Sequence, residues 1–82
     1  MIAAVEIVAV KGVEYDVLAH FPKSDPAYSD YVALIPGDVM EEPNSWTVRV
    51  LRRKFRRDYA GAVLTLYVDV FQEARKPAEA SA

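Results

Sequence analysis

The chain has 82 residues, of which 52% are apolar and 27% are charged, a balance typical of one small globular domain rather than of a disordered chain. It contains no cysteine, which excludes a disulfide framework and thiolate chemistry. Its longest uncharged apolar run falls short of the ~20 residues that a membrane-spanning helix needs, and its first residues lack the basic region of a secretory signal. We therefore expect a cytoplasmic protein with no role in a membrane.

The net charge of −2 hides a division of charge between the two halves of the chain. Residues 1–45 carry two cations and eight acids, a net charge of −6, whereas residues 46–82 carry eight cations and four acids, a net charge of +4. Such a division can provide a basic face for an anionic partner. It is equally compatible with two halves that neutralise each other, within one fold or across a homodimer.

Two apolar runs near the N-terminus predict a β-hairpin. Residues 2–10 are apolar except for Glu6, which is typical of a strand covered on both faces inside a sheet. In residues 13–21, alternation places five apolar side chains on one face: Val13, Tyr15, Val17, Ala19 and Phe21. The Lys11-Gly12 pair between the two runs predicts the turn.

The segment from Pro22 to Asn44 predicts a short helix followed by turns. Ser24-Asp25-Pro26 provides a capping side chain and a first-turn proline. One helical face would then contain Ala27, Tyr31, Leu34 and Ile35, although residues 31–35 would also suit a short strand. Pro36-Gly37 predicts a turn, and residues 41–45 predict an acidic loop.

Six cations lie within nine positions of the segment 46–59, which we call the basic element: Arg49, Arg52, Arg53, Lys54, Arg56 and Arg57. As a helix, the basic element would place Val48, Leu51, Phe55 and Tyr59 on one stripe. As a strand, it would place Trp46, Val48 and Val50 on one face and pair with residues 62–71 through a turn between positions 56 and 61. The β-branched residues at its start favour the strand, whereas its second half fits either conformation.

Residues 62–71 predict a strand in both cases. Its core side would carry Leu64, Leu66, Val68 and Val70, and its other side Thr65, Tyr67 and Asp69. Residues 74–82 are small and polar and predict a flexible tail. The sequence therefore predicts a single α+β domain over residues 1–73, with an antiparallel sheet built from hairpins and one short helical segment packed on it.

The basic element is the leading candidate for a binding site. Guanidinium groups bind phosphates through paired donors, and aromatic rings provide stacking surfaces for exposed bases. The predicted binding residues are the six cations of the basic element together with Trp46, Phe55 and Tyr59. We therefore expect a non-catalytic binding module with nucleic acid as its first-ranked partner.

Two other interpretations of the basic element stay open. An acidic protein surface would also suit it, including the acidic first half of a second copy in a homodimer, and the protein would then be an interaction or assembly subunit. Alternatively, charges along a solvated sheet edge prevent the association of sheets and need no partner.

The sequence carries no family signature and no catalytic or metal-binding motif. The single histidine, His20, lies near acids in the sequence, but no serine or cysteine occurs in a nucleophile context. The five acids between residues 25 and 42 match no calcium-binding spacing, and no glycine lies in a phosphate-binding loop. We therefore expect neither an enzyme nor a bound cofactor or metal.

Overall fold

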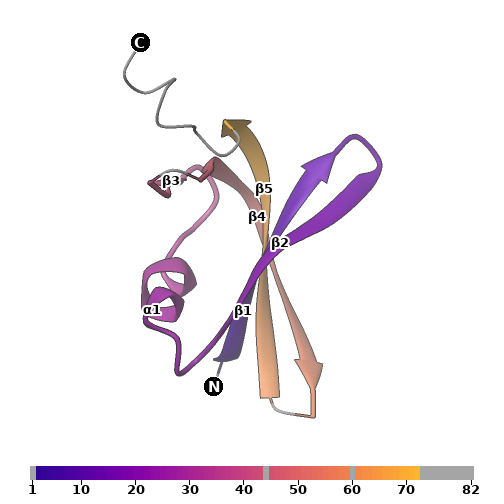
Figure 1. Ribbon diagram of the computed structural model, residues 1–82. Helices are drawn as coiled ribbons and strands as arrows, with labels where there is room; N and C mark the ends of the chain where they lie inside the picture. The colour runs from indigo at the N-terminus through magenta and orange to yellow at the C-terminus, as the bar shows by residue number, and fades with distance from the viewer. Residues whose placement is uncertain (1, 44, 60, 73–82) are drawn as a thin grey trace.

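The computed structural model describes residues 2–43, 45–59 and 61–72. The elements follow in the order β1 (Ile2–Lys11), β2 (Glu14–Pro22), α1 (Pro26–Val32), β3 (Val39–Glu41), β4 (Thr47–Asp58) and β5 (Gly61–Gln72) (Figure 1). The predicted α+β class, with a hairpin-built sheet and one short helix, is confirmed. The predicted tail, residues 74–82, lies outside the described residues. Within the described residues, the one helix, α1, has seven residues. It is far too short to cross a bilayer.

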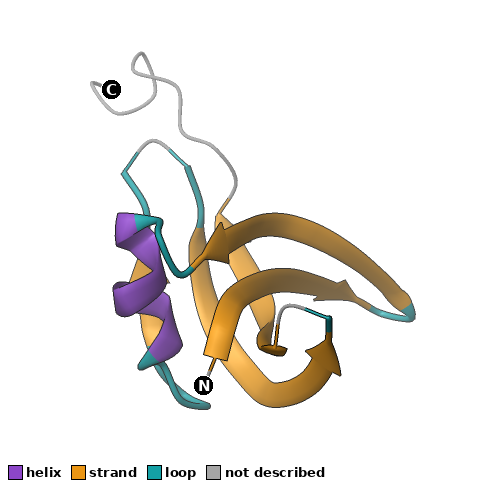
Figure 2. Cartoon of the chain, turned by 90° about the horizontal axis from the view of Figure 1, so that it is seen from below, coloured by secondary structure: helices purple, strands orange, loops and turns teal. Residues whose placement is uncertain are grey.

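The strands form one sheet in the order β2-β1-β5-β4-β3. The hairpins β1–β2 and β4–β5 and the pair β3–β4 are antiparallel, whereas β1 pairs with β5 in parallel. The two long hairpins cross each other in Figure 1, and Figure 2 shows how strongly their strands curve. β5 is therefore the central strand, and the two long hairpins meet along its contact with β1.

The sheet has two faces of different character. The face covered by α1, which we call the helix face, holds the core, formed by Val5, Ile7, Ala9, Tyr31, Val48, Val50, Leu64, Leu66 and Val68. The opposite face, which we call the open face, has no described element packed on it. The pairs Glu6–Thr65 and Val8–Tyr67 of β1 and β5 lie on the open face, because they alternate with core residues.

The helix begins where the sequence predicts it. The Asp25 carboxylate accepts a hydrogen bond from the Ala27 amide at 2.9 Å, which satisfies one of the free N–H groups of the first turn. The Tyr31 ring stacks on Phe21 of β2, with ring centroids 5.1 Å apart. Since α1 ends at Val32, the alternative strand over residues 31–35 is wrong.

A β-bulge in β2 interrupts the pairing of the first hairpin. Ile7 pairs with Ala19, but the next residue, Val8, pairs with Val17. Leu18 is therefore an extra residue on β2, and a bulge of this kind shifts the alternation of side chains by one position.

The bulge corrects the prediction that five apolar residues of this segment share one face. Ala19 and Phe21 pack against the core. In contrast, Tyr15 and Val17 are exposed, and Val13, which lies in the turn, is 92% exposed. The expectation failed because alternation predicts a common face only where the pairing is regular.

The basic element forms a strand over all but its two end residues. β4 runs from Thr47 to Asp58 and pairs with β5 up to the pair Asp58–Gly61, so the helical alternative is wrong. A second bulge lies between the pairs Val50–Val68 and Arg52–Tyr67, where Leu51 is the extra residue.

Val68 is fully buried in β5, and Val68→Ala removes two methyl groups from the core. We expect the free energy of unfolding to fall by about 1–3 kcal/mol. Asp69→Ala is the matched control, because Asp69 is the adjacent, exposed residue on the open face, and its effect should stay within about 0.5 kcal/mol. Urea unfolding measures both variants, and equal urea midpoints would contradict these assignments of the two faces.

Candidate functional site

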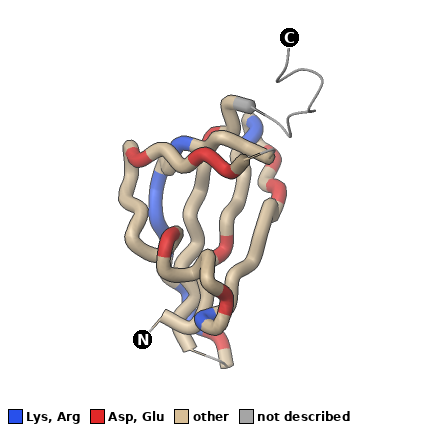
Figure 3. The backbone as a smooth tube through the Cα atoms, turned by 60° about the vertical axis from the view of Figure 1, so that its left-hand side comes forward, with Lys and Arg blue, Asp and Glu red and all other residues tan. Residues whose placement is uncertain are grey.

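The alternation along β4, shifted by the bulge at Leu51, divides the cations of the basic element between the two faces. Their pairing with β5 and the alternation along β4 place four on the open face, Arg49, Arg52, Lys54 and Arg56, and two on the helix face, Arg53 and Arg57. The longest continuous blue stretch of the backbone in Figure 3 belongs to this strand. The structure therefore brings together four of the six predicted cations.

Two arginines of the open face lie over aromatic rings. The guanidinium carbon of Arg52 is 4.0 Å from the centre of the Tyr67 ring, and that of Arg49 is 4.5 Å from the centre of the Phe71 ring. Tyr67 also makes an edge-to-face contact with Tyr15 of β2, with centroids 5.7 Å apart. This row of rings and guanidinium groups provides flat surfaces that carry positive charge.

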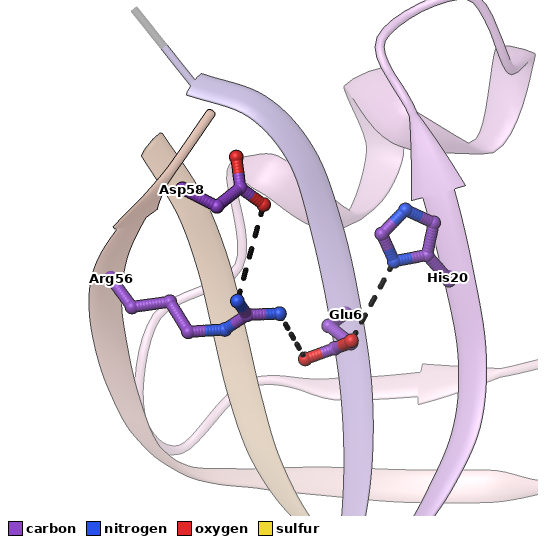
Figure 4. Close-up of polar contacts among 4 residues, drawn as sticks. All are labelled: Glu6, His20, Arg56 and Asp58. Carbon is purple, nitrogen blue, oxygen red and sulfur yellow. Dashed lines mark hydrogen bonds and ion pairs between the residues drawn. The ribbon is translucent and has the colours of Figure 1, made fainter. Parts of the chain in front are cut away.

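Glu6 connects the first hairpin to the basic element (Figure 4). One of its carboxylate oxygens is 3.4 Å from Arg56 Nη2, and the other is 3.6 Å from His20 Nδ1. Arg56 also lies 4.0 Å from a carboxylate oxygen of Asp58. The contacts with Glu6 and Asp58 fix the direction of Arg56, and these two partly exposed ion pairs contribute little to stability.

A groove of about 250 Å³ lies on the open face beside these contacts. The central strands β1 and β5 provide its floor, with Glu6, Val8, Thr65 and Tyr67. The walls come from Tyr15 and Val17 of β2 and from Lys54 and Arg56 of β4. The groove therefore combines a carboxylate, two cations, a threonine hydroxyl and two tyrosine rings.

Arg53 has a structural position under the helix. Its Nη2 atom donates a hydrogen bond to the Val32 carbonyl at 3.3 Å, where the last carbonyls of α1 lack helical partners. Its Nε atom is buried and forms no hydrogen bond within the described residues, and its guanidinium carbon lies 5.4 Å from the centre of the Phe55 ring. A cation at the C-terminus of a helix is stabilising, so Arg53 serves the fold.

The three aromatic residues predicted for the site lie apart from the open-face cations. Trp46 packs against the core, Phe55 is half-exposed on the helix face, and Tyr59 is fully exposed after the end of β4. The aromatic residues that do meet the cations are Tyr67 and Phe71. Only the register could have identified Tyr67, because it places Tyr67 opposite Arg52, whereas Phe71 has no partner in the pairing of β4 with β5.

Within the described residues, no group of three or more histidine, cysteine, aspartate or glutamate side chains could hold a metal ion. No protein-family model matches the chain, and neither the curated proteins nor the solved structures give a significant match. The description of the candidate site on the open face therefore rests on the geometry of the described residues alone.

Tyr31 is the one described residue with a clearly displaced pKa. Burial raises the pKa of its hydroxyl above the ordinary value, and the hydrogen bond that it donates to Glu42 at 2.6 Å acts in the same direction. The indole N–H of Trp46 opposes the shift, although no well-aligned hydrogen bond joins the two side chains. The stabilisation from this raised pKa is fully present below the pKa of the unfolded chain, about 10, and is lost as the pH rises through the folded-state pKa.

Tyr31→Phe should lower the free energy of unfolding by about 1–3 kcal/mol near neutral pH, because it removes a hydrogen bond to a carboxylate. As the pH rises above about 10, the wild-type protein loses this advantage and the difference between the two proteins should narrow. Urea unfolding at about pH 8 and about pH 11 measures the difference, with the exposed Tyr59→Phe as control. A difference of the same size at both pH values would contradict the raised pKa.

Proposed function

We propose that the protein binds single-stranded nucleic acid across the open face of its sheet. The observation that supports this best is the placement of Arg49 and Arg52 over aromatic rings on a face that no described element covers. Together with Lys54, these arginines form no ion pair within the described residues. Their charges are therefore available to an anionic ligand.

A single strand matches this face better than a duplex does. Cations bind backbone phosphates whatever the sequence, while aromatic rings and guanidinium planes stack on unpaired bases. A duplex keeps its base faces stacked inside the helix, so that Tyr67 and Phe71 could contribute nothing to binding it.

The alternative without a partner explains less of the geometry. The pairing of β4 with β3, and with the loop before β3, ends at Val50, so its later residues form an edge that charges would protect from association. Charge alone would achieve this protection. It does not require guanidinium groups to lie over rings, and it does not require a groove beside them.

Fluorescence anisotropy with labelled single strands of mixed DNA and RNA sequence, at increasing salt, tests the proposal. We expect binding at low salt that weakens linearly on a log–log plot, with a slope of about 0.7 for each phosphate contact. A duplex of the same sequence should bind more weakly at equal salt. If no single strand binds at low salt, the proposal is wrong.

Arg52→Gln and Arg57→Gln form a matched pair, because they remove the same charge from opposite faces of one strand. Arg52→Gln should weaken binding and flatten the salt slope by about 0.7, and it should do so similarly for unrelated sequences. Arg57→Gln should have a clearly smaller effect. Equal losses for the two variants would indicate attraction by net charge rather than binding on the open face.

Tyr67→Leu and Phe55→Leu make the same comparison for stacking. If a base stacks against the open face, Tyr67→Leu should weaken binding by about 1–3 kcal/mol, whereas Phe55→Leu on the helix face should leave the affinity close to that of the wild type. Circular dichroism and urea unfolding check that both variants are folded. Unchanged affinity in a folded Tyr67→Leu variant would exclude stacking at this position.

A protein partner, including a second copy of the chain, is the second candidate. It is favoured by the apolar side chains exposed along the outer half of the first hairpin, Val13, Tyr15 and Val17. They belong to β2 and to the turn before it, and β2 lies at an edge of the sheet, where other chains can add a strand. Light scattering would support this candidate if it shows a dimer at micromolar concentration while oligonucleotides fail to bind at low salt.

A further inference from the structure

The groove on the open face has the size of a site for one ring system. Its volume of about 250 Å³ is below the range of about 300–1,000 Å³ that encloses drug-sized ligands. Val17 and the Tyr15 ring form one wall, and Val8 and Tyr67 form part of the floor. Such surroundings suit a flat, unpaired base better than a whole nucleotide.

The Glu6 carboxylate gives this groove a specific polar contact. Glu6 lines the groove from β1, and its side chain is 19% exposed. Its two oxygens together offer about four acceptor positions. The contacts with Arg56 at 3.4 Å and His20 at 3.6 Å occupy two of them and are both long, so each oxygen can still accept a hydrogen bond from a ligand.

We propose that this groove receives an unpaired guanine base from the bound strand, an inference that rests on the proposed function. Guanine carries two adjacent donors, the ring N1–H and the N2 amino group, which match the two oxygens of one carboxylate. Adenine and cytosine place an unprotonated ring nitrogen beside their amino group, and thymine and uracil place carbonyls on both sides of one N–H. Each of these bases would direct a lone pair at Glu6.

The remaining polar groups of the groove suit the other edges of the same base. Lys54 and Arg56 stand on the β4 wall, and cations of these two types are the commonest partners of guanine O6 and N7. The carboxylate and the cations thus present acceptors and donors within one groove. Guanine presents the complementary groups: donors at N1–H and the N2 amino group, and acceptors at O6 and N7.

Short oligo-dT strands of about nine nucleotides, a length within the range that small single-strand-binding domains cover, test this inference. Each strand carries one central dG, dA, dC or dT, and the wild-type protein should bind the dG strand about 10-fold or more tighter than the all-dT strand. Replacing dG by deoxyinosine, which lacks the N2 amino group, should remove most of the preference without any change to the protein.

Glu6→Gln tests the protein side, because an amide has one donor and one acceptor where the carboxylate has two acceptors. The variant should lose the preference for dG, so that the dG strand and the all-dT strand bind it with equal affinity, and dA should gain relative to dG. A general folding defect would instead weaken all four strands equally. Glu14→Gln, an exposed carboxylate of the same hairpin outside the groove, is the matched control and should keep the dG preference.

The outcomes separate this inference from the proposed function. Salt-dependent binding of all four strands with equal affinity would overturn the guanine site and leave strand binding intact. Failure of every strand to bind at low salt would overturn both. If free GMP binds as tightly as the dG strand, and more tightly than AMP, the groove is a site for a free nucleotide. The inference that its base comes from a bound strand would then be wrong.

Discussion

The parallel pairing of β1 with β5 is the contact on which the rest of the structure depends. An isolated two-stranded hairpin is at best marginally stable in water, and this pairing joins the two long hairpins into one sheet. It places Val5 and Ile7 beside Leu64 and Leu66, and α1 covers the surface that these residues form. The same pairing brings Glu6 to Arg56, fifty positions away in the sequence.

The bulges at Leu18 and Leu51 then decide which side chains the outer half of β2 and the second half of β4 display on each face. Without the extra residue Leu51, the residues Arg52, Lys54 and Arg56 would continue the face of Val48 and Val50 and point toward the core. Burying unpaired cations there would be costly. With the bulge, these three cations turn to the open face, whereas Arg53 and Arg57 turn to the helix face. The extra residue Leu18 likewise turns Tyr15 and Val17 to the open face. The groove between β2 and β4 is a product of both irregularities.

The local pattern of the sequence predicted the features that depend on residues close together in the chain. The capping residue Asp25, the turn at Gly12 and the buried side of β5 all lie where the sequence places them. The β1–β5 contact was not predictable in this way, because its strands are far apart in the chain and apolar residues permit several registers. β3, with three residues, is too short to give a pattern.

The site was predictable only in part, for the same reason. Composition located the cations. A bulge, however, exchanges the faces of the residues that follow it, and no local signal marks Leu51 as the extra residue. The sequence therefore groups Arg53 with cations that lie across the sheet from it. The rings that meet the arginines come from β5, and only Tyr67 is placed there by the register, whereas the aromatic residues near the basic element in sequence lie elsewhere.

At position 6, the side chain that would suit the strand differs from the Glu6 carboxylate that the groove contains. Its neighbours Val5 and Ile7 are fully buried, and every other residue from 2 to 10 is apolar, so an apolar side chain at position 6 would suit the strand. The ion pair with Arg56, whose side chain is 46% exposed, contributes only about 0–1 kcal/mol by the measure of exposed pairs. Stability therefore gives little reason for a carboxylate at this position. Its clear consequence is geometric: it holds Arg56 at the wall of the groove and presents acceptor oxygens inside it, which is the arrangement that a ligand with paired donors requires.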